Sequence, residues 1–199
     1  YNMVKYLVAP ARMPDELTWF KWEAYTTWLS GFALLTIIYY AGAGLYMIDN
    51  EILDLEPWQA VALSIGGIVG GWVAYDALCR SPLGRDTRGL VIAGFVFIVF
   101  LAWGYAEIFS ARGAFVQIGV TIGTIMVANV AMVIIPGQKK VVAKLIAGEE
   151  PDPQHGARAK QRSLHNNYLT LPVVFVMIGG HYPAVFATEY AWVILALVL

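Results

Sequence analysis

The sequence contains very little cysteine and very little charge. Its 199 residues include one cysteine, Cys79, so the chain alone cannot form an internal disulfide, a CxxC zinc site or a CxxCH attachment for covalent haem. Charged residues make up 14% and hydrophobic residues 59% of the chain, and the mean hydropathy is +0.62. This balance is too apolar for a soluble domain of this length. The net charge of −1 gives no reason to expect a nucleic acid as a partner.

The sequence also lacks a recognisable start and end. Residues 1–5 contain no initiator methionine, and no apolar core follows a basic start, so we expect no signal peptide here. An apolar run that begins near residue 190 is cut off at Leu199, at about half the length that a transmembrane helix needs. We therefore expect the chain to be an internal fragment.

Five apolar stretches are each about 20 residues long, the length at which an α-helix crosses a hydrocarbon core about 30 Å thick. They cover approximately residues 26–48, 58–79, 90–110, 114–135 and 167–187, and a sixth begins at 190. Their continuous, glycine-rich character argues against a transmembrane β-barrel, whose strands alternate strictly. The sequence therefore predicts an all-α, polytopic transmembrane helix bundle with five full spans and a truncated sixth, forming a single domain over residues 1–199.

Basic residues concentrate in two of the loops that separate these stretches. They are Arg80, Arg85, Arg88, Lys139, Lys140, Lys144, Arg158, Lys160 and Arg162. Because cytoplasmic loops carry an excess of Lys and Arg, loops 80–89 and 136–166 are predicted to be cytoplasmic. Within the second loop, residues 137–166, an amphipathic stretch precedes a proline-containing turn, which indicates a surface helix followed by a linker.

Small residues are spaced four apart in the second stretch. Gly66, Gly67, Gly70 and Gly71 have the spacing that lets two helix backbones approach closely. We expect close helix packing there.

Two histidines lie near the two ends of the fifth stretch. Asn166 and Asn167 precede the apolar run and are predicted to cap its helix. His165 is then either an interfacial side chain, a haem or metal ligand, or a proton-transfer residue. His181 lies near the other end, about 24 Å further along a helix at about 1.5 Å per residue, so one metal cannot bind both.

Polar residues fall at two depths of the predicted bundle. The outer group is predicted to form a pocket in which Glu107 is the strongest catalytic candidate, because a carboxylate in a membrane helix is costly unless it faces the bundle or water. For Gln117 and Thr121 the favoured alternative is hydrogen bonding between helices. This group consists of Tyr105, Glu107, Gln117, Thr121 and His181.

The inner group lies near the cytoplasmic face. Asp76 either takes part in proton transfer or pairs with Arg80 four residues later, and the pairing is slightly favoured. The group consists of Tyr75, Asp76, Asn129, His165, Asn166 and Asn167.

Several long blocks of this sequence resemble one known family. The run RSLHNNYLTLPVVFVMIGGHYP, from Arg162 to Pro183, resembles the membrane domain of the cytochrome c-linked urate oxidases, also called urate hydroxylase PuuD. Further similar blocks are KYLVAP, WFKWEAYTTWLSG, YDALCRSPLG and GTIMVANVAMVIIP. Together they cover nearly the whole chain.

The resemblance implies an eight-helix domain in the bacterial inner membrane, followed by a c-type cytochrome. It also implies oxidation of urate to 5-hydroxyisourate, with electrons passed to haem and on to cytochrome c or a fused cytochrome c domain. The leading hypothesis is therefore a membrane-bound urate oxidase. Its catalytic candidates are Glu107, Gln117, Asp76 and Asn129, and its candidates for binding haem are His181 and His165, as iron ligands, with Tyr182.

Two other functional classes remain open at this point. Glycine-rich helix faces and an amphipathic loop equally suit a non-catalytic transmembrane subunit of a larger respiratory or photosynthetic complex. A small transporter is less favoured, because the sequence shows neither inverted repeats nor paired broken helices.

Overall fold

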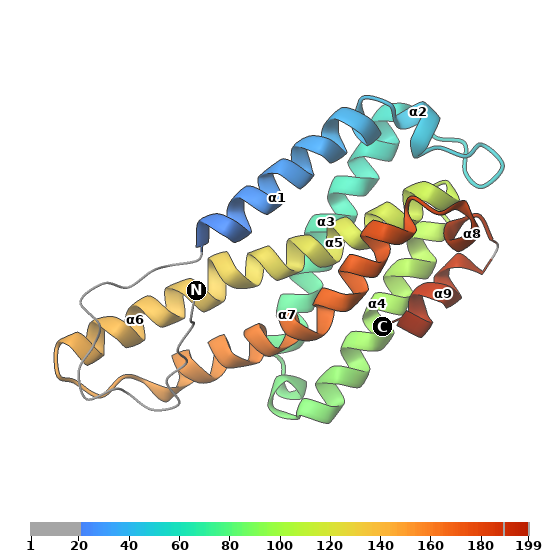
Figure 1. The fold of residues 1–199 in the computed structure, drawn as a ribbon. Helices are drawn as coiled ribbons and strands as arrows, with labels where there is room; N and C mark the ends of the chain where they lie inside the picture. Colours follow the sequence, from blue (N-terminus) through green and yellow to red (C-terminus); the bar gives the residue numbers. More distant parts are fainter. Residues whose placement is uncertain (1–20, 189, 199) are drawn as a thin grey trace.

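The computed structural model describes residues 21–188 and 190–198, and within these ranges the chain is helical with no strands (Figure 1). The predicted all-α class is confirmed. The α-helices are α1 (Lys21–Leu35), α2 (Ala43–Tyr46), α3 (Pro57–Arg80), α4 (Thr87–Ala106), α5 (Ala111–Ala128), α6 (Ile135–Ile146), α7 (Pro153–Gly179), α8 (Pro183–Phe186) and α9 (Ala191–Val198). The π-helical segments η1 (Thr36–Tyr40) and η3 (Asn129–Ile134) and the 3₁₀ turn η2 (Pro82–Arg85) connect them.

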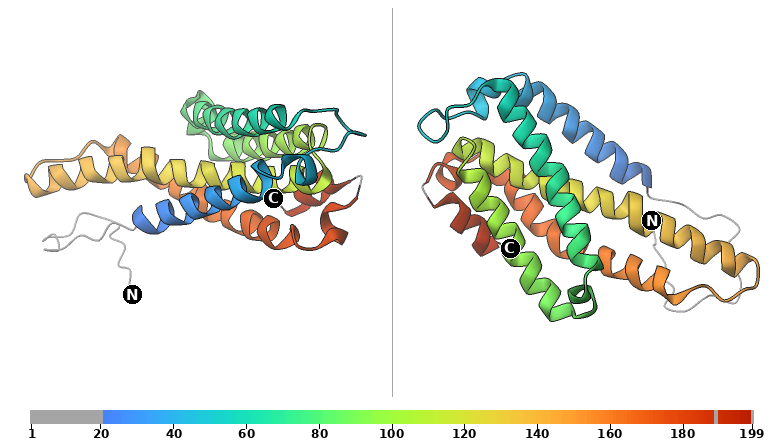
Figure 2. Two further views of the ribbon diagram at one scale, coloured as in Figure 1. Left: turned by 90° about the horizontal axis from the view of Figure 1, so that it is seen from above. Right: turned by 180° about the vertical axis from the view of Figure 1, so that it is seen from behind.

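Helix α5 lies at the centre of the bundle. It contacts α1, α3, α4 and α7. Figure 2 shows α3 and α4 on one side of it and α1 and α7 on the other. Its side chains Phe115, Ile118, Ile122 and Ile125 are almost completely buried. The core of the bundle is therefore built around this helix.

Local sequence explains where three helices begin. The Asp86 carboxylate accepts hydrogen bonds from the first turn of α4, and the Ser110 hydroxyl accepts one from Gly113 N in α5, at 3.1 Å. Asp152 accepts one from Gln154 N at 2.9 Å, and Pro153 occupies the first position of α7. Such caps satisfy backbone donors that the first turn of a helix leaves free.

The predicted start of the fifth helix is wrong. Asn166 and Asn167 do not cap a helix but lie in the middle of α7, because the Asp152 cap and Pro153 start the helix more than three turns earlier. The predicted surface helix within residues 137–166 is also not separate, since α6 continues α5 without interruption from Ala111 to Ile146. Only residues 147–152 link it to α7.

Three helices are long and apolar enough to cross a membrane: α3, α4 and the continuous helix Ala111–Ile146. The sequence predicted five full spans. In the first predicted span, η1 and a turn at residues 41–42 interrupt the helix. In the fifth, α7 has a charged first half and ends at Gly179. Side chains such as Ile92, Val96 and Phe100 of α4 are exposed, as expected for contact with lipid rather than water.

The glycine pairs of α3 differ in what surrounds them. A Cβ at Gly67 would lie 2.5 Å from the Tyr105 hydroxyl, and one at Gly71 would lie 2.7 Å from Thr121 Cγ2. At Gly66 and Gly70 nothing lies within 4 Å. The expected close packing therefore involves Gly67 and Gly71, which face α4 and α5.

We predict that Gly67→Ala and Gly71→Ala each destabilise the protein by about 1–3 kcal/mol, because the added methyl group overpacks the contact with α4 or α5. The matched variants Gly66→Ala and Gly70→Ala are expected to leave stability unchanged or slightly raised, since alanine favours a helix. Thermal unfolding of the detergent-solubilised protein, followed by tryptophan fluorescence, measures this difference. Equal effects of both pairs would contradict the packing described.

Candidate functional site

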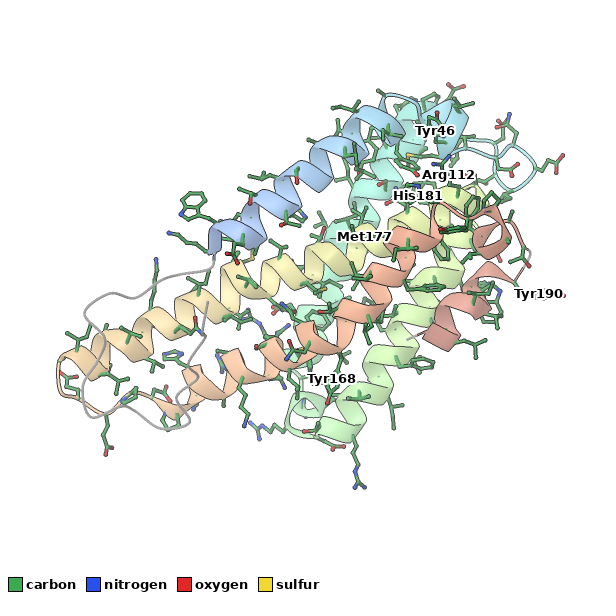
Figure 3. The ribbon with its side chains drawn as sticks, in the orientation of Figure 1. Tyr46, Arg112, Tyr168, Met177, His181 and Tyr190 are labelled. Carbon is green, nitrogen blue, oxygen red and sulfur yellow. The ribbon has the colours of Figure 1, made fainter. Side chains whose placement is uncertain are left out.

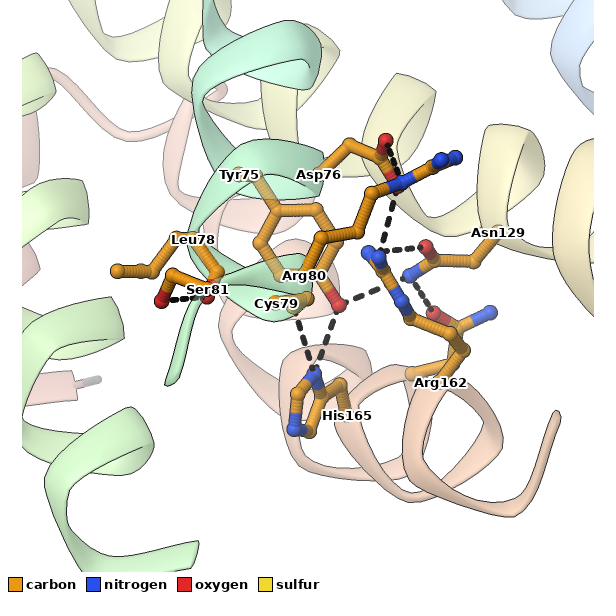
Figure 4. A network of polar contacts seen from close by, with 10 residues as sticks. Tyr75, Asp76, Leu78, Cys79, Arg80, Ser81, Asn129, Arg162 and His165 are labelled. Carbon is orange, nitrogen blue, oxygen red and sulfur yellow. Dashed lines mark hydrogen bonds and ion pairs between the residues drawn. The ribbon is translucent and has the colours of Figure 1, made fainter. Parts of the chain in front are cut away.

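A buried ion pair joins α3 to α7. Arg162 of α7 is 3% exposed, and its Nη2 lies 2.7 Å from Asp76 Oδ1. The other carboxylate oxygen, Asp76 Oδ2, lies 2.6 Å from Nε of Arg80, which is largely exposed (Figure 4). We call this part of the molecule, where Arg80, Arg85 and Arg162 lie, the basic end. The sequence-based alternative of an Asp76–Arg80 pair is thus present, but Arg162 is a second and more deeply buried partner.

Asn129 connects this ion pair to the rest of the polar network. It is 1% exposed and opens the π-helical segment η3. Its Oδ1 accepts a hydrogen bond from Arg162 Nη1 at 3.2 Å, and its Nδ2 donates to the Tyr75 hydroxyl at 3.1 Å and to Asn166 Oδ1 at 2.9 Å. Asn166 Nδ2 in turn donates to the backbone carbonyl of Met126 at 2.9 Å.

The amide orientations in this network are determined at both ends. A guanidinium can only donate, so the group of Asn129 that faces Arg162 must be its oxygen. A backbone carbonyl can only accept, so the group of Asn166 that faces Met126 must be its NH₂. The direction of every hydrogen bond between these two ends follows, and the Tyr75 hydroxyl therefore accepts from Asn129.

The Tyr75 hydroxyl also contacts His165. Its oxygen lies 2.7 Å from His165 Nδ1, and in the tautomer with the proton on Nε2 this nitrogen accepts the Tyr75 hydrogen. Burial lowers the pKa of His165, and the nearby Arg162 guanidinium lowers it further. Both effects favour the neutral form of the imidazole. Arg162 also lies over the Tyr75 ring, 4.9 Å from its centroid.

A second set of buried polar groups lies further along α5. Ser64 Oγ donates to Gln117 Oε1 at 2.9 Å and lies 2.8 Å from the Tyr40 hydroxyl. The Tyr105 hydroxyl lies 2.8 Å from Thr121 Oγ1. Gln117 and Thr121 therefore make hydrogen bonds between helices, the alternative favoured for them from sequence.

The pocket predicted to combine Glu107 with Gln117, Thr121 and His181 is wrong. Gln117 and Thr121 are fully buried, whereas Glu107 and His181 are exposed. Glu107 lines a separate cavity of about 330 Å³. His181 follows the end of α7 that lies far from the basic end (Figure 3), and Tyr182 next to it in the sequence is also exposed.

A comparison with protein families identifies the family of this chain. The family model described as urate oxidase N-terminal matches residues 1–199. The chain belongs to the urate oxidase N-terminal family. Membership indicates a urate-related oxidoreductase function. No significant match is found among curated proteins or solved structures.

The described residues of this urate oxidase N-terminal chain do not fit a haem held between two of its own histidines. His155 and His165 lie on α7 about 15 Å apart along the helix axis at about 1.5 Å per residue, and His181 follows the end of that helix. Within residues 21–188 and 190–198, no three His, Cys, Asp or Glu side chains come together as a metal site. The hydrogen bond between His165 and Tyr75 involves Nδ1 and therefore does not exclude iron binding through Nε2 of His165.

Arg162 is the site residue that was not singled out from sequence, where it was counted only as a loop charge. The spacing could have revealed it, because His165 and Asn166 follow Arg162 by three and four residues, so the three side chains share one face of a helix. That face exists only if the helix begins before residue 162. Because the predicted helix started too late, the sequence analysis did not place Arg162 in the site.

We predict that Arg162→Gln destabilises this urate oxidase N-terminal chain by about 3 kcal/mol, because it leaves the buried Asp76 carboxylate with one exposed partner. The matched variant Arg88→Gln, at an exposed arginine, is expected to change stability by less than about 0.5 kcal/mol. Thermal unfolding in detergent measures both. An Arg162→Gln protein as stable as Arg88→Gln would contradict the role of the buried ion pair.

Proposed function

We propose that this protein is a membrane-bound urate oxidase that passes electrons to a cytochrome c. In the proposed reaction, water supplies a hydroxyl group to C5 of urate, giving 5-hydroxyisourate, two protons and two electrons. A cytochrome c, or a c-type domain of the same protein, accepts the electrons one at a time. Family membership and the buried polar network at the basic end support this proposal.

The proposed membrane arrangement extends beyond the three long apolar helices. In it, the segment from α1 to α2 and the segment from α7 to α8 also cross the bilayer, as parts of an eight-helix domain. The basic end faces the cytoplasm of a bacterial inner membrane, because Arg80, Arg85, Arg88 and Lys140 would lie on that side. The exposed apolar side chains of α3 and α4 support contact with lipid.

The network supplies what a proton-abstracting site requires. With its proton on Nε2, neutral His165 accepts the hydrogen of Tyr75, so in this tautomer a proton taken up by the Tyr75 oxygen can pass to His165 Nδ1. Asp76 and Asn129 hold Arg162 and Tyr75 in place and are positioning residues. We therefore assign the chemistry to this network and not to Glu107 or Gln117, which lie elsewhere in the bundle. Haem, when present, would supply one-electron chemistry and requires ligands beyond those described here.

We predict that membranes containing the full-length protein consume urate and reduce two molecules of cytochrome c for each urate. His165→Gln is expected to lower kcat by about 10²-fold or more, because the proton acceptor is lost. Leu164→Ala, at the exposed neighbouring position, serves as the control and is expected to retain activity. Urate absorbance and cytochrome c reduction are the two readouts. Folded protein with no urate consumption would instead favour a non-catalytic subunit.

The state of His165 predicts the direction of the pH dependence. Its pKa lies below the ordinary value of 6.5, so the imidazole is neutral at pH 7 and gains a proton only as the pH falls further. Protonation removes the acceptor for the Tyr75 hydrogen, so kcat at saturating urate is expected to be constant from about pH 7 to 8 and to fall below about pH 6.5. In His165→Gln this acidic decline is expected to disappear. An identical decline in the variant would assign the titration to another group.

A further inference from the structure

A cavity of about 590 Å³ opens at the basic end, between the end of α3, η2, the start of α6 and α7. Its basic lining residues come from all four elements and are Arg80, Arg85, Lys140, Arg158 and Arg162. No Asp or Glu belongs to its lining within the part of the chain that the structure describes. Its volume falls within the range of about 300–1,000 Å³ that small-molecule sites occupy.

The carboxylate that pairs with two of these basic residues does not neutralise the lining. Asp76 is not among the lining residues and binds two guanidiniums at once, one on each oxygen. The shared carboxylate balances one of these two charges, and Arg85, Lys140 and Arg158 add three more to the lining. The cavity is therefore strongly positive, and low-dielectric walls increase the attraction of such a site for an anion.

The cavity also reaches the polar network. Arg162 and Cys79 both line it, and Cys79 Sγ lies 3.9 Å from His165 Nδ1. Arg162 is nine-tenths or more buried, and its orientation is fixed by Asp76 and Asn129. A ligand in the cavity would consequently contact the fixed Arg162 guanidinium and Cys79, and both of these residues contact members of the polar network (Figure 4).

We propose that this cavity binds the urate anion. The inference rests on the proposed function and adds to it the place and the chemistry of substrate binding. Urate is a flat monoanion at neutral pH with oxygen atoms along its edges, which suits the planar, multi-donor guanidinium group. Arg162 orients the anion at the inner wall, and Arg158 and Lys140 attract it at the exposed rim.

The phosphate of an anionic lipid is the competing occupant, because basic pockets at the cytoplasmic ends of helices bind lipid headgroups. Two features favour urate. The cavity extends inward to the buried Arg162, and its lining includes Cys79, whose Sγ lies 3.9 Å from His165 Nδ1. A lipid phosphate needs only the exposed rim.

The first test measures equilibrium binding of radiolabelled urate to the purified full-length protein in detergent. The double variant Lys140→Gln/Arg158→Gln is expected to bind urate about tenfold more weakly, because two attracting charges are lost. The control is Lys139→Gln/Lys160→Gln, which removes two exposed charges from the same helices outside the cavity and is expected to bind like the unmodified protein. Equal affinity in both double variants would overturn the proposal.

The second test locates the ligand through Cys79. Urate in the cavity is expected to slow alkylation of Cys79 by a small thiol reagent, measured by mass spectrometry of the peptide that contains it. Protection by phosphatidylglycerol or inorganic phosphate but not by urate would assign the cavity to phosphate and overturn the proposal, with the added lipid and the free ion distinguishing the two sources.

The outcomes also separate this inference from the proposed function. Urate turnover with an unchanged KM in Lys140→Gln/Arg158→Gln would leave the enzyme assignment intact and remove the binding site. Charge-dependent urate binding without any turnover would support the binding site and contradict the enzyme assignment.

Discussion

The contact between the Arg162 guanidinium and the Asp76 carboxylate, 2.7 Å apart, constrains the whole basic end of the bundle. Removing two charges from water is unfavourable unless each is paired and hydrogen-bonded, so neither residue can be buried there alone. The pair requires α7 to begin well before its apolar half, because only then does Arg162 lie on a helix that faces α3. Asn129 then satisfies a further donor of the same guanidinium. The same arginine adds to the effect of burial on the pKa of His165 and contributes one of the positive charges that line the cavity.

The π-helical segment η3 shows how the central helix meets this constraint. A π-helical turn contains an extra residue compared with an α-helical turn, and such turns often occur at functional sites. Asn129 opens this segment and is almost completely buried, with hydrogen bonds to α3 and α7. The helix nevertheless continues through it as one element from Ala111 to Ile146. At about 1.5 Å per residue this element is longer than the hydrocarbon core, so it extends into the region of the cavity.

Sequence reasoning was successful where the physical rule is local or compositional. Apolar stretches predicted a helical bundle, and the residues Tyr75, Asp76, Asn129, His165 and Asn166 were placed together at one depth, as the structure has them. It failed where a helix start was assigned from a weaker local signal. Asn166 and Asn167 looked like caps, but Asp152 and Pro153 start the helix. The helical turns between Pro153 and Asn166 are polar, so apolar composition does not show that they belong to α7. The pocket around Glu107 failed for another reason, since depth along the helices does not show which side of a helix faces inward.

In the proposed function, the buried Asp76–Arg162 pair both stabilises the bundle and provides a charge that binds an anionic substrate. Arg162, 3% exposed inside an apolar helix bundle, is the side chain assigned to both roles. The most direct measurement is a double-mutant cycle on thermal unfolding with Asp76→Asn, Arg162→Gln and the double variant. The account predicts that the double variant is at least about 1 kcal/mol more stable than the sum of the two single effects implies, because each single change strands a buried charge. Additive effects would show that the two side chains act independently and would contradict it.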